Sequence, residues 1–136
     1  MTEGYSEGTL AGLSVNNTYN GYLQRQTVTA LNGGTTLQGA AYGYDTAGRL
    51  LTVTDSPYVA TYAYQANSWL LNTVTFKNGA TTNLVTSRQY DRLNRLQSIA
   101  NINPQPSTLN SFGYAYNSAN QRTRATLADG SCWVYD

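Results

Sequence analysis

The chain contains no histidine and only one cysteine among its 136 residues. Without histidine, a Ser-His-Asp or Cys-His catalytic arrangement and a histidine metal site are impossible within this chain. The single cysteine, Cys132, forms no internal disulfide, and buried packing is its expected role because no histidine is present to activate its thiol. These absences point away from catalysis, and we expect neither a cofactor nor a metal.

Charge of either sign is also scarce. Charged residues make up 11% of the chain, the net charge is +1, and Lys77 is the only lysine. The arginines are scattered beside turns and form no basic block, so the positive field that nucleic acid requires is missing. No apolar run approaches the roughly 20 residues of a membrane-spanning helix. We therefore expect no nucleic-acid partner and no membrane span.

Helical periodicity is absent from every window of the sequence. Short runs rich in Thr, Val and Tyr alternate instead with turn-forming pairs, which is typical of strands. The pairs Asn78-Gly79 and Asp129-Gly130 suit the type I′ turn, and further turns are expected at 32–34 and 56–57. The pattern predicts an all-β protein, an antiparallel meander of about eleven strands.

A phrase of the form Tyr-x-Tyr-Asp, followed by Gly-Arg-Leu, recurs with variations at 42–50, 62–70, 88–96 and 114–122. Such recurrence indicates one supersecondary unit stacked on copies of itself. Tyr42 and Tyr44 lie two residues apart on a strand and share a face. Asp45 can accept hydrogen bonds from the backbone ahead of it, and Gly48 can take the left-handed conformation that closes a hairpin loop.

The other units hold asparagine at the position of Gly48, and asparagine tolerates positive φ best after glycine. Ser68 breaks this rule, so a different geometry or a longer loop is expected at 64–69. The residues assigned structural roles at the repeat turns are Tyr44, Asp45, Gly48, Arg49, Tyr90, Asp91, Asn94, Arg95, Tyr116, Asn117 and Asn120.

These units resemble the YD repeat of the rearrangement-hotspot (RHS) proteins, which also occurs in bacterial insecticidal toxin complexes and in teneurins. The match is closest at 42–54 and 88–99, looser at 62–74 and 114–126, and faint at 19–22, while 133–136 reads as the opening of a further unit. The resemblance implies a long β-strip that forms a hollow shell, often around a toxic segment. It also implies an exported bacterial protein, extracellular or at the cell surface, although residues 1–5 do not begin a secretory signal.

Composition adds to this interpretation. Phe76 and Phe112 are the only phenylalanines, and the hydrophobic residues are concentrated in tyrosine. We therefore expect a thin or curved sheet held by cross-strand pairs more than by an aliphatic core. Residues 1–136 are expected to form a single YD-repeat domain, a fragment of a longer array. Its function would be structural and non-catalytic, as part of a β-shell or a self-assembling β-structure.

Two other functions are compatible with the sequence. Tyrosine ladders and tryptophans can stack on sugar rings, which would make the chain a carbohydrate-binding or adhesion module; exposure of Trp69 or Trp133 would favour this. The residues that would stack are Tyr42, Tyr62, Tyr64, Trp69, Tyr114 and Trp133. A small hydrolase would instead need two close carboxylates among Glu3, Glu7, Asp45, Asp55, Asp91, Asp129 and Asp136.

The composition of segment 131–135 indicates what the chain can pair with. It is short, apolar and free of lysine or proline, so it lacks the usual protection of a sheet edge against pairing. We expect it to pair with flanking repeats of a parent protein or with other copies of the chain.

Overall fold

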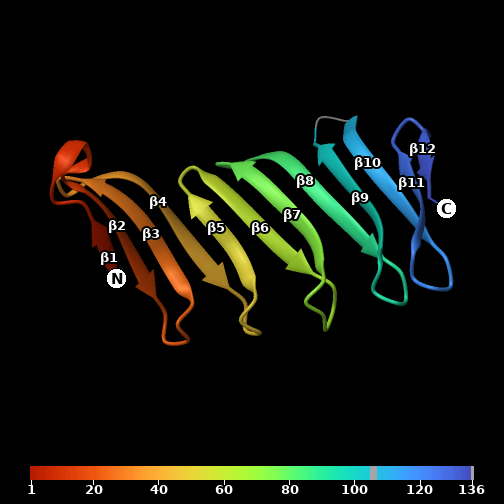
Figure 1. Cartoon of the computed structure of the whole chain (residues 1–136), viewed down its shortest axis with the longest axis horizontal. Helices are drawn as coiled ribbons and strands as arrows, with labels where there is room; N and C mark the ends of the chain where they lie inside the picture. Colours follow the sequence, from red (N-terminus) through yellow and green to blue (C-terminus); the bar gives the residue numbers. More distant parts are fainter. Residues whose placement is uncertain (105–106, 136) are drawn as a thin grey trace. The chain divides into compact units, whose positions relative to one another are not determined.

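The computed structural model describes residues 1–104 and 107–135, so Asp136 lies outside the described residues. Twelve strands hydrogen-bond in sequence order from β1 to β12 (Figure 1), and the pairings described are antiparallel. The other regular element in these ranges is a short 3-10 turn, η1 (Gly8–Leu10). The predicted all-β antiparallel meander is confirmed, with twelve strands where about eleven were expected.

The strands fall into two compact units, Met1–Ala60 and Thr61–Asp136. The first contains β1 (Thr2–Gly4), β2 (Leu13–Tyr19), β3 (Arg25–Asn32), β4 (Thr35–Tyr44), β5 (Leu50–Asp55) and the start of β6 (Tyr58–Tyr64). The second contains the rest of β6, β7 (Leu71–Asn78), β8 (Thr81–Tyr90), β9 (Leu96–Asn103), β10 (Ser107–Tyr116), β11 (Arg122–Leu127) and β12 (Cys132–Val134). That residues 1–136 form one domain stays a prediction.

The loops at Asn78-Gly79 and Asp129-Gly130 are not the type I′ turns that the sequence predicted. A type I′ turn needs positive φ at both central residues, and among the described residues this holds at Gly33 and Gly34, with φ of 56° and 86°. At the Asn78-Gly79 site Asn78 belongs to β7, and only Gly79 has positive φ. At the Asp129-Gly130 site only Gly130 has positive φ, and the loop is closed by a hydrogen bond from the N–H of Leu127 to the carbonyl of Ser131. The type I′ prediction was therefore wrong at both of these sites, because the glycine alone takes up the left-handed conformation.

The register gives each unit two chemically different faces, because directly paired residues share a face. In the first unit, one face carries Val15, Val28, Ala30, Ala40, Tyr42 and Val53, and the other carries Ser14, Asn16, Thr27, Thr29, Thr52 and Thr54. In the second unit, one face carries Val74, Leu84, Ile99, Phe112, Tyr114 and Ala125, and the other carries Ser87, Ser98, Ala100, Ser111, Gly113 and Thr126.

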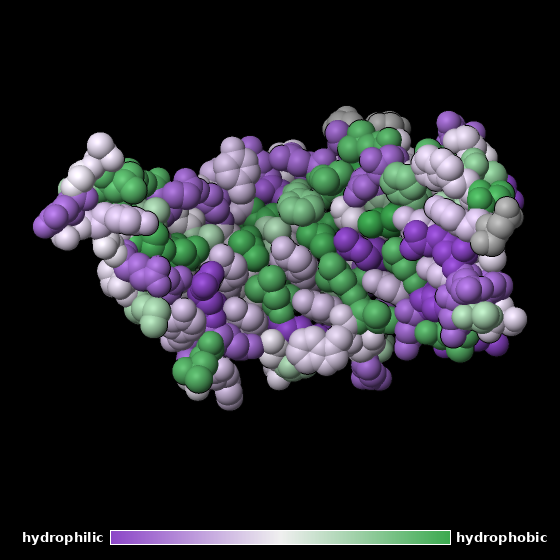
Figure 2. Space-filling view, viewed as in Figure 1, coloured by the Kyte–Doolittle hydropathy of each residue, from purple (hydrophilic) through white to green (hydrophobic). Residues whose placement is uncertain are grey.

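Neither unit has a deep core. Among the described residues, the buried hydrophobic side chains are Val74 and Ala125, at 6% and 3% exposure, and the one buried polar residue is Thr86. Thr86 donates its hydroxyl hydrogen to Oδ1 of Asn101 at 2.7 Å. The prediction that Cys132 is buried was wrong: its side chain is exposed, because it lies in the edge strand β12. Figure 2 shows hydrophobic side chains at the surface, mixed with hydrophilic ones. The thin sheet expected from the composition is confirmed, since most side chains remain partly exposed.

Candidate functional site

The repeat turns at 20–24, 45–49, 91–95 and 117–121 share one backbone design. In each, the N–H of the first residue donates to the carbonyl of the fifth, and the N–H of the fourth donates to the carbonyl of the first, at 2.9–3.1 Å. One strand residue past each turn, the register shifts by a β-bulge. The turn and the bulge together form a unit that the chain uses repeatedly, because both occur at the same place in each repeat.

The fourth position of each turn has positive φ. Its value is 78° at Gly48, 61° at Asn94 and 64° at Asn120, which confirms the expectation for all three residues. Leu23 occupies the same position in turn 20–24, with φ of 61° and an exposed fraction of 84%. Sequence reasoning found only the faint match at 19–22 and predicted no left-handed residue in this turn, because leucine does not favour that region.

The side chain at the first position organises the turn. In turn 91–95, Oδ1 of Asp91 accepts hydrogen bonds from the N–H groups of Leu93 and Arg95, at 2.8 and 3.0 Å. Oδ1 of Asp45 does the same for Ala47 and Arg49. The backbone N–H of the fifth residue, assisted by that residue's guanidinium, holds the pKa of each carboxyl below its usual value.

The first and fifth side chains pair with each other in every one of these turns. Arg49 and Arg95 donate from Nε to Oδ2 of Asp45 and Asp91, each at 2.7 Å. In turns 20–24 and 117–121 both members are neutral amides: the asparagine Nδ2 donates to the glutamine Oε1, at 2.8 and 2.9 Å. The two positions therefore change together, from an ion pair to an amide pair of similar geometry.

The remaining turn, 65–70, is built differently, as Ser68 led us to expect. Its closing hydrogen bond runs from the N–H of Gln65 to the carbonyl of Leu70, at 2.8 Å, so this turn is one residue longer than the others. Asn67, with φ of 54°, takes the left-handed position. The prediction of a longer loop is confirmed.

The tyrosine that precedes a turn connects neighbouring repeats. The hydroxyls of Tyr44, Tyr90 and Tyr116 donate to the carbonyls of Arg25, Leu71 and Leu96, at 2.9, 3.0 and 2.8 Å. Each acceptor is the residue that directly follows the preceding turn. The paired register of β9 and β10 ends at Gly113 and Ser98, so the Tyr116 hydroxyl binds a carbonyl beyond the end of that ladder.

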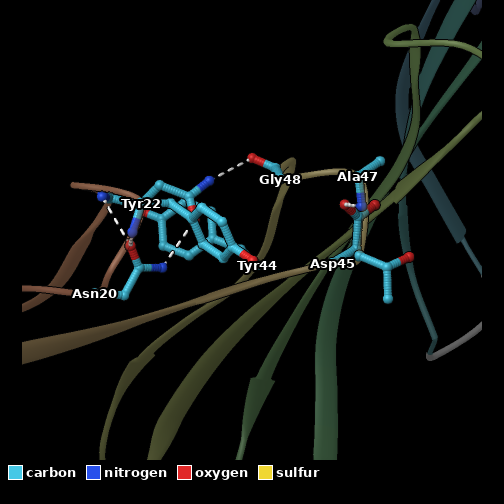
Figure 3. Close-up of a pocket in the computed structure, with 8 residues that line it drawn as sticks. Asn20, Tyr22, Tyr44, Asp45, Ala47 and Gly48 are labelled. Atoms are coloured by element: carbon cyan, nitrogen blue, oxygen red, sulfur yellow. Dashed lines mark hydrogen bonds between the residues drawn. The ribbon is translucent and has the colours of Figure 1, made fainter.

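A pocket of about 610 Å³ lies between the first two turns (Figure 3). Its lining residues are Asn20, Tyr22, Gln24, Tyr44, Asp45, Thr46, Ala47 and Gly48. Nε2 of Gln24 crosses from one turn to the next and donates to the Gly48 carbonyl at 2.8 Å. Oδ1 of Asn20 and Oδ1 of Asp45 each accept two backbone N–H groups of their own turns. Most polar side chains of the pocket are therefore engaged in holding the turns together.

A second contact between turns lies in the other unit. Nη1 of Arg95 donates to Oδ1 of Asn120 at 2.9 Å and reaches the Asn117 carbonyl at 3.4 Å. The same guanidinium lies over the ring of Tyr116, 4.6 Å from its centre. Both contacts between turns start from the fifth residue of one turn and end on the following turn.

The residues proposed for glycan stacking are not equally accessible. The side chains of Tyr42, Tyr62, Tyr64 and Tyr114 are half-buried, and the guanidinium of Arg122 covers the ring of Tyr114 at 4.2 Å. The two tryptophans are exposed, Trp69 at 72% and Trp133 at 55%. Exposure of a tryptophan is the observation that favours stacking, whereas the tyrosines are engaged in the sheet.

No group of three or more His, Cys, Asp or Glu side chains that could hold a metal ion occurs among residues 1–104 and 107–135. Within these residues no helix is long and apolar enough to cross a membrane.

Comparison with known proteins finds structures with a similar fold. Neither a protein-family model nor a curated protein sequence matches the chain. The crystal structure of TcdB2-TccC3-Cdc42 matches with a TM-score of 0.56 and 14% identity over 83% of this chain. A Tc holotoxin pore of Photorhabdus luminescens matches with the same values. The chain spans 7% of the length of these proteins.

The matched proteins are RHS/YD-repeat shell proteins of Tc toxins. At 14% identity the likeness concerns the fold, and it confirms the repeat architecture that the Tyr-x-Tyr-Asp phrase predicted. The chain has the fold of a YD-repeat shell segment.

Proposed function

We propose that the chain is a non-catalytic structural module, a section of a β-shell in a larger protein. The observation that carries this proposal is the turn design at 20–24, 45–49, 91–95 and 117–121, together with a sheet that has almost no core. Repeat proteins of this kind gain stability from contacts between neighbouring units. The match to the Tc toxin shell supports the same function. An exported bacterial protein, extracellular or at the cell surface, is the setting that this function implies.

The geometry of the carboxylates favours this role over hydrolysis. A general acid needs a raised pKa, whereas the pKa values of Asp45, Asp91 and Asp129 are lowered by hydrogen bonds within their own turns. Their oxygens serve the backbone of those turns.

An extended chain tests the proposal. Residues 46–136 are appended after Asp136, so that Asp136 takes the place of Asp45 in a completed turn. If neighbouring repeats stabilise one another, the extended chain unfolds in one transition at a higher urea midpoint than the parent. An unchanged midpoint, or two separate transitions, would show that the repeats do not support one another.

Assembly through edge strands is the second part of this proposal. In the described structure β12 pairs with β11 alone, and Trp133 and Val134 are exposed at 55% and 69%. We expect the parent chain to self-associate in light scattering across a wide concentration range, and the variant Trp133→Lys with Val134→Pro to do so less. A parent that is monomeric at every concentration would contradict edge pairing.

Carbohydrate binding is a second candidate, which the exposure of Trp69 favours. An exposed indole can stack on a sugar ring. A glycan array probed with the parent and with Trp69→Ala tests it: binding lost in the variant supports this function, and the absence of binding by the parent contradicts it.

A further inference from the structure

The contact between the first two turns uses a single hydrogen-bond donor. Gln24 has two functions on its amide: Oε1 accepts from Nδ2 of Asn20 in its own turn, and Nε2 donates to the Gly48 carbonyl in the next turn, both at 2.8 Å. Figure 3 shows the hydrogen bond that reaches the Gly48 carbonyl. One half of the side chain therefore closes its own turn, and the other half binds its neighbour.

Arg95 has the same divided role in the second unit. Its Nε binds Oδ2 of Asp91 within the turn, at 2.7 Å, while Nη1 binds Oδ1 of Asn120 in the following turn, at 2.9 Å. Gly48 and Asn120 occupy the same turn position, the fourth. In both units, the donor at the fifth position meets an acceptor on the fourth residue of the next turn.

Gln121 occupies the fifth position of turn 117–121 and fills only half of this role. Its Oε1 accepts from Nδ2 of Asn117 at 2.9 Å, as Gln24 does from Asn20. Its Nε2 has no hydrogen bond among residues 1–104 and 107–135, and the side chain is exposed. The turn thus presents a donor whose geometry is fixed by the amide pair but whose acceptor is not among these residues.

We propose that the fifth turn residue is a directional connector, and that Nε2 of Gln121 is a docking group for the fourth residue of another YD-type turn. The partner is a following repeat of the same kind, because the acceptors that Gln24 and Arg95 meet belong to such turns. In both contacts the donor lies on the earlier turn and the acceptor on the later one, so the contact is head to tail. This inference rests on the proposed shell function and names the atoms through which repeats recognise one another.

A substitution of glutamine by glutamate removes the hydrogen bond to the next turn and keeps the hydrogen bond within the residue's own turn. Glutamate keeps the oxygen that accepts from the asparagine and loses the N–H that reaches the next turn. In the parent chain, Gln24→Glu leaves the Gly48 carbonyl without its donor, and we expect the unfolding equilibrium constant to rise about tenfold. Gln121→Glu, the matched control, is expected to change it less than about twofold, because it removes no existing bond.

Two controls separate the loss of this hydrogen bond from charge repulsion and from a general loss of stability. Measuring at about 1 M salt shortens the Debye length to about 3 Å, so repulsion between the new carboxylate and Asp45 is largely screened. Hydrogen exchange gives a local readout: Gln24→Glu should speed exchange at the amides of Asp45 and Gly48, which close the neighbouring turn. Equal effects of Gln24→Glu and Gln121→Glu, or exchange unchanged at turn 45–49, would overturn the connector.

The extended chain then tests the docking group itself. Its added turn places a second copy of Gly48 after Gln121, and Gln121→Glu should now raise the unfolding constant about as much as Gln24→Glu does. If the extended chain is stabilised but remains indifferent to Gln121→Glu, the connector assignment of Gln121 is wrong while the shell function stands. If the midpoint of the extended chain does not rise at all, the shell function fails instead. The urea midpoint of the parent chain could instead depend on protein concentration, and Gln121→Glu could abolish that dependence. This result would identify a second copy of the chain as the partner of Gln121 and would contradict a following repeat in that role.

Discussion

Removal of a single hydroxyl should reveal how much the contacts between repeats contribute to stability. The substitution Tyr116→Phe deletes the hydrogen bond to the Leu96 carbonyl, which is 2.8 Å long and partly buried. A neutral hydrogen bond contributes about 0.5–1.5 kcal/mol net, and a carbonyl left without its partner adds to the loss. Because the site is only partly shielded from water, we expect a loss of about 1–2 kcal/mol.

The matched control lies in the same strand. Tyr114→Phe removes a hydroxyl that has no hydrogen bond to the described residues, and both rings keep the guanidinium that covers them, Arg95 for Tyr116 and Arg122 for Tyr114. Urea unfolding should show a lower midpoint for Tyr116→Phe at unchanged m-value, and a change within about 0.5 kcal/mol for Tyr114→Phe. Equal midpoints for the two variants would refute the reasoning that the hydroxyl ties one repeat to the next.

The remaining predictions concern the turns. Gly48 has φ of 78°, so Gly48→Val should cost roughly 1–3 kcal/mol through backbone strain, whereas valine at exposed Thr46 should cost little; equal melting temperatures would reject the turn assignment. Leu23→Asn should raise the melting temperature, because asparagine tolerates the φ of 61° at this position better than leucine. Asp91 has a lowered pKa, so its stabilisation is present above the unfolded value of about 3.9 and is lost as pH falls through the lower folded value. The double variant Asp91→Asn with Arg95→Gln, which copies the amide pair of turn 117–121, should therefore lose less stability than the parent below about pH 4; identical acid profiles would contradict this.

The sequence predicted those parts of the fold that depend on local chemistry. Gly48 and Asn94 were recognisable as left-handed positions because few residue types tolerate positive φ. Turn 20–24 gave only a faint match at 19–22, because Leu23 violates that preference; the paired amides around Leu23 hold it in this conformation. Local preference also failed at Asn78, which suits a type I′ turn in isolation but is drawn into β7 by its register with Thr81.

The pairing of first and fifth turn residues could have been found from the sequence, since Asp45 with Arg49 and Asn20 with Gln24 differ at both positions together. The contact from a fifth residue to the next turn could not, because it joins residues 24 or 25 apart whose approach depends on the strand register between them.

The repeat turns use either an ion pair or an amide pair between their first and fifth residues, and the two pairs respond differently to salt and acid. An ion pair at the surface contributes little net energy and is weakened by salt and by acid, whereas an amide pair is insensitive to both. Each type still offers one N–H beyond its own turn, from Nη1 of Arg95 or Nε2 of Gln24. The chain can therefore vary the charge along the row of turns while it keeps the donor that connects them. The connecting donor is common to both pair types, so this donor, and not the ion pair, accounts for the contacts that Gln24 and Arg95 make with the following turns.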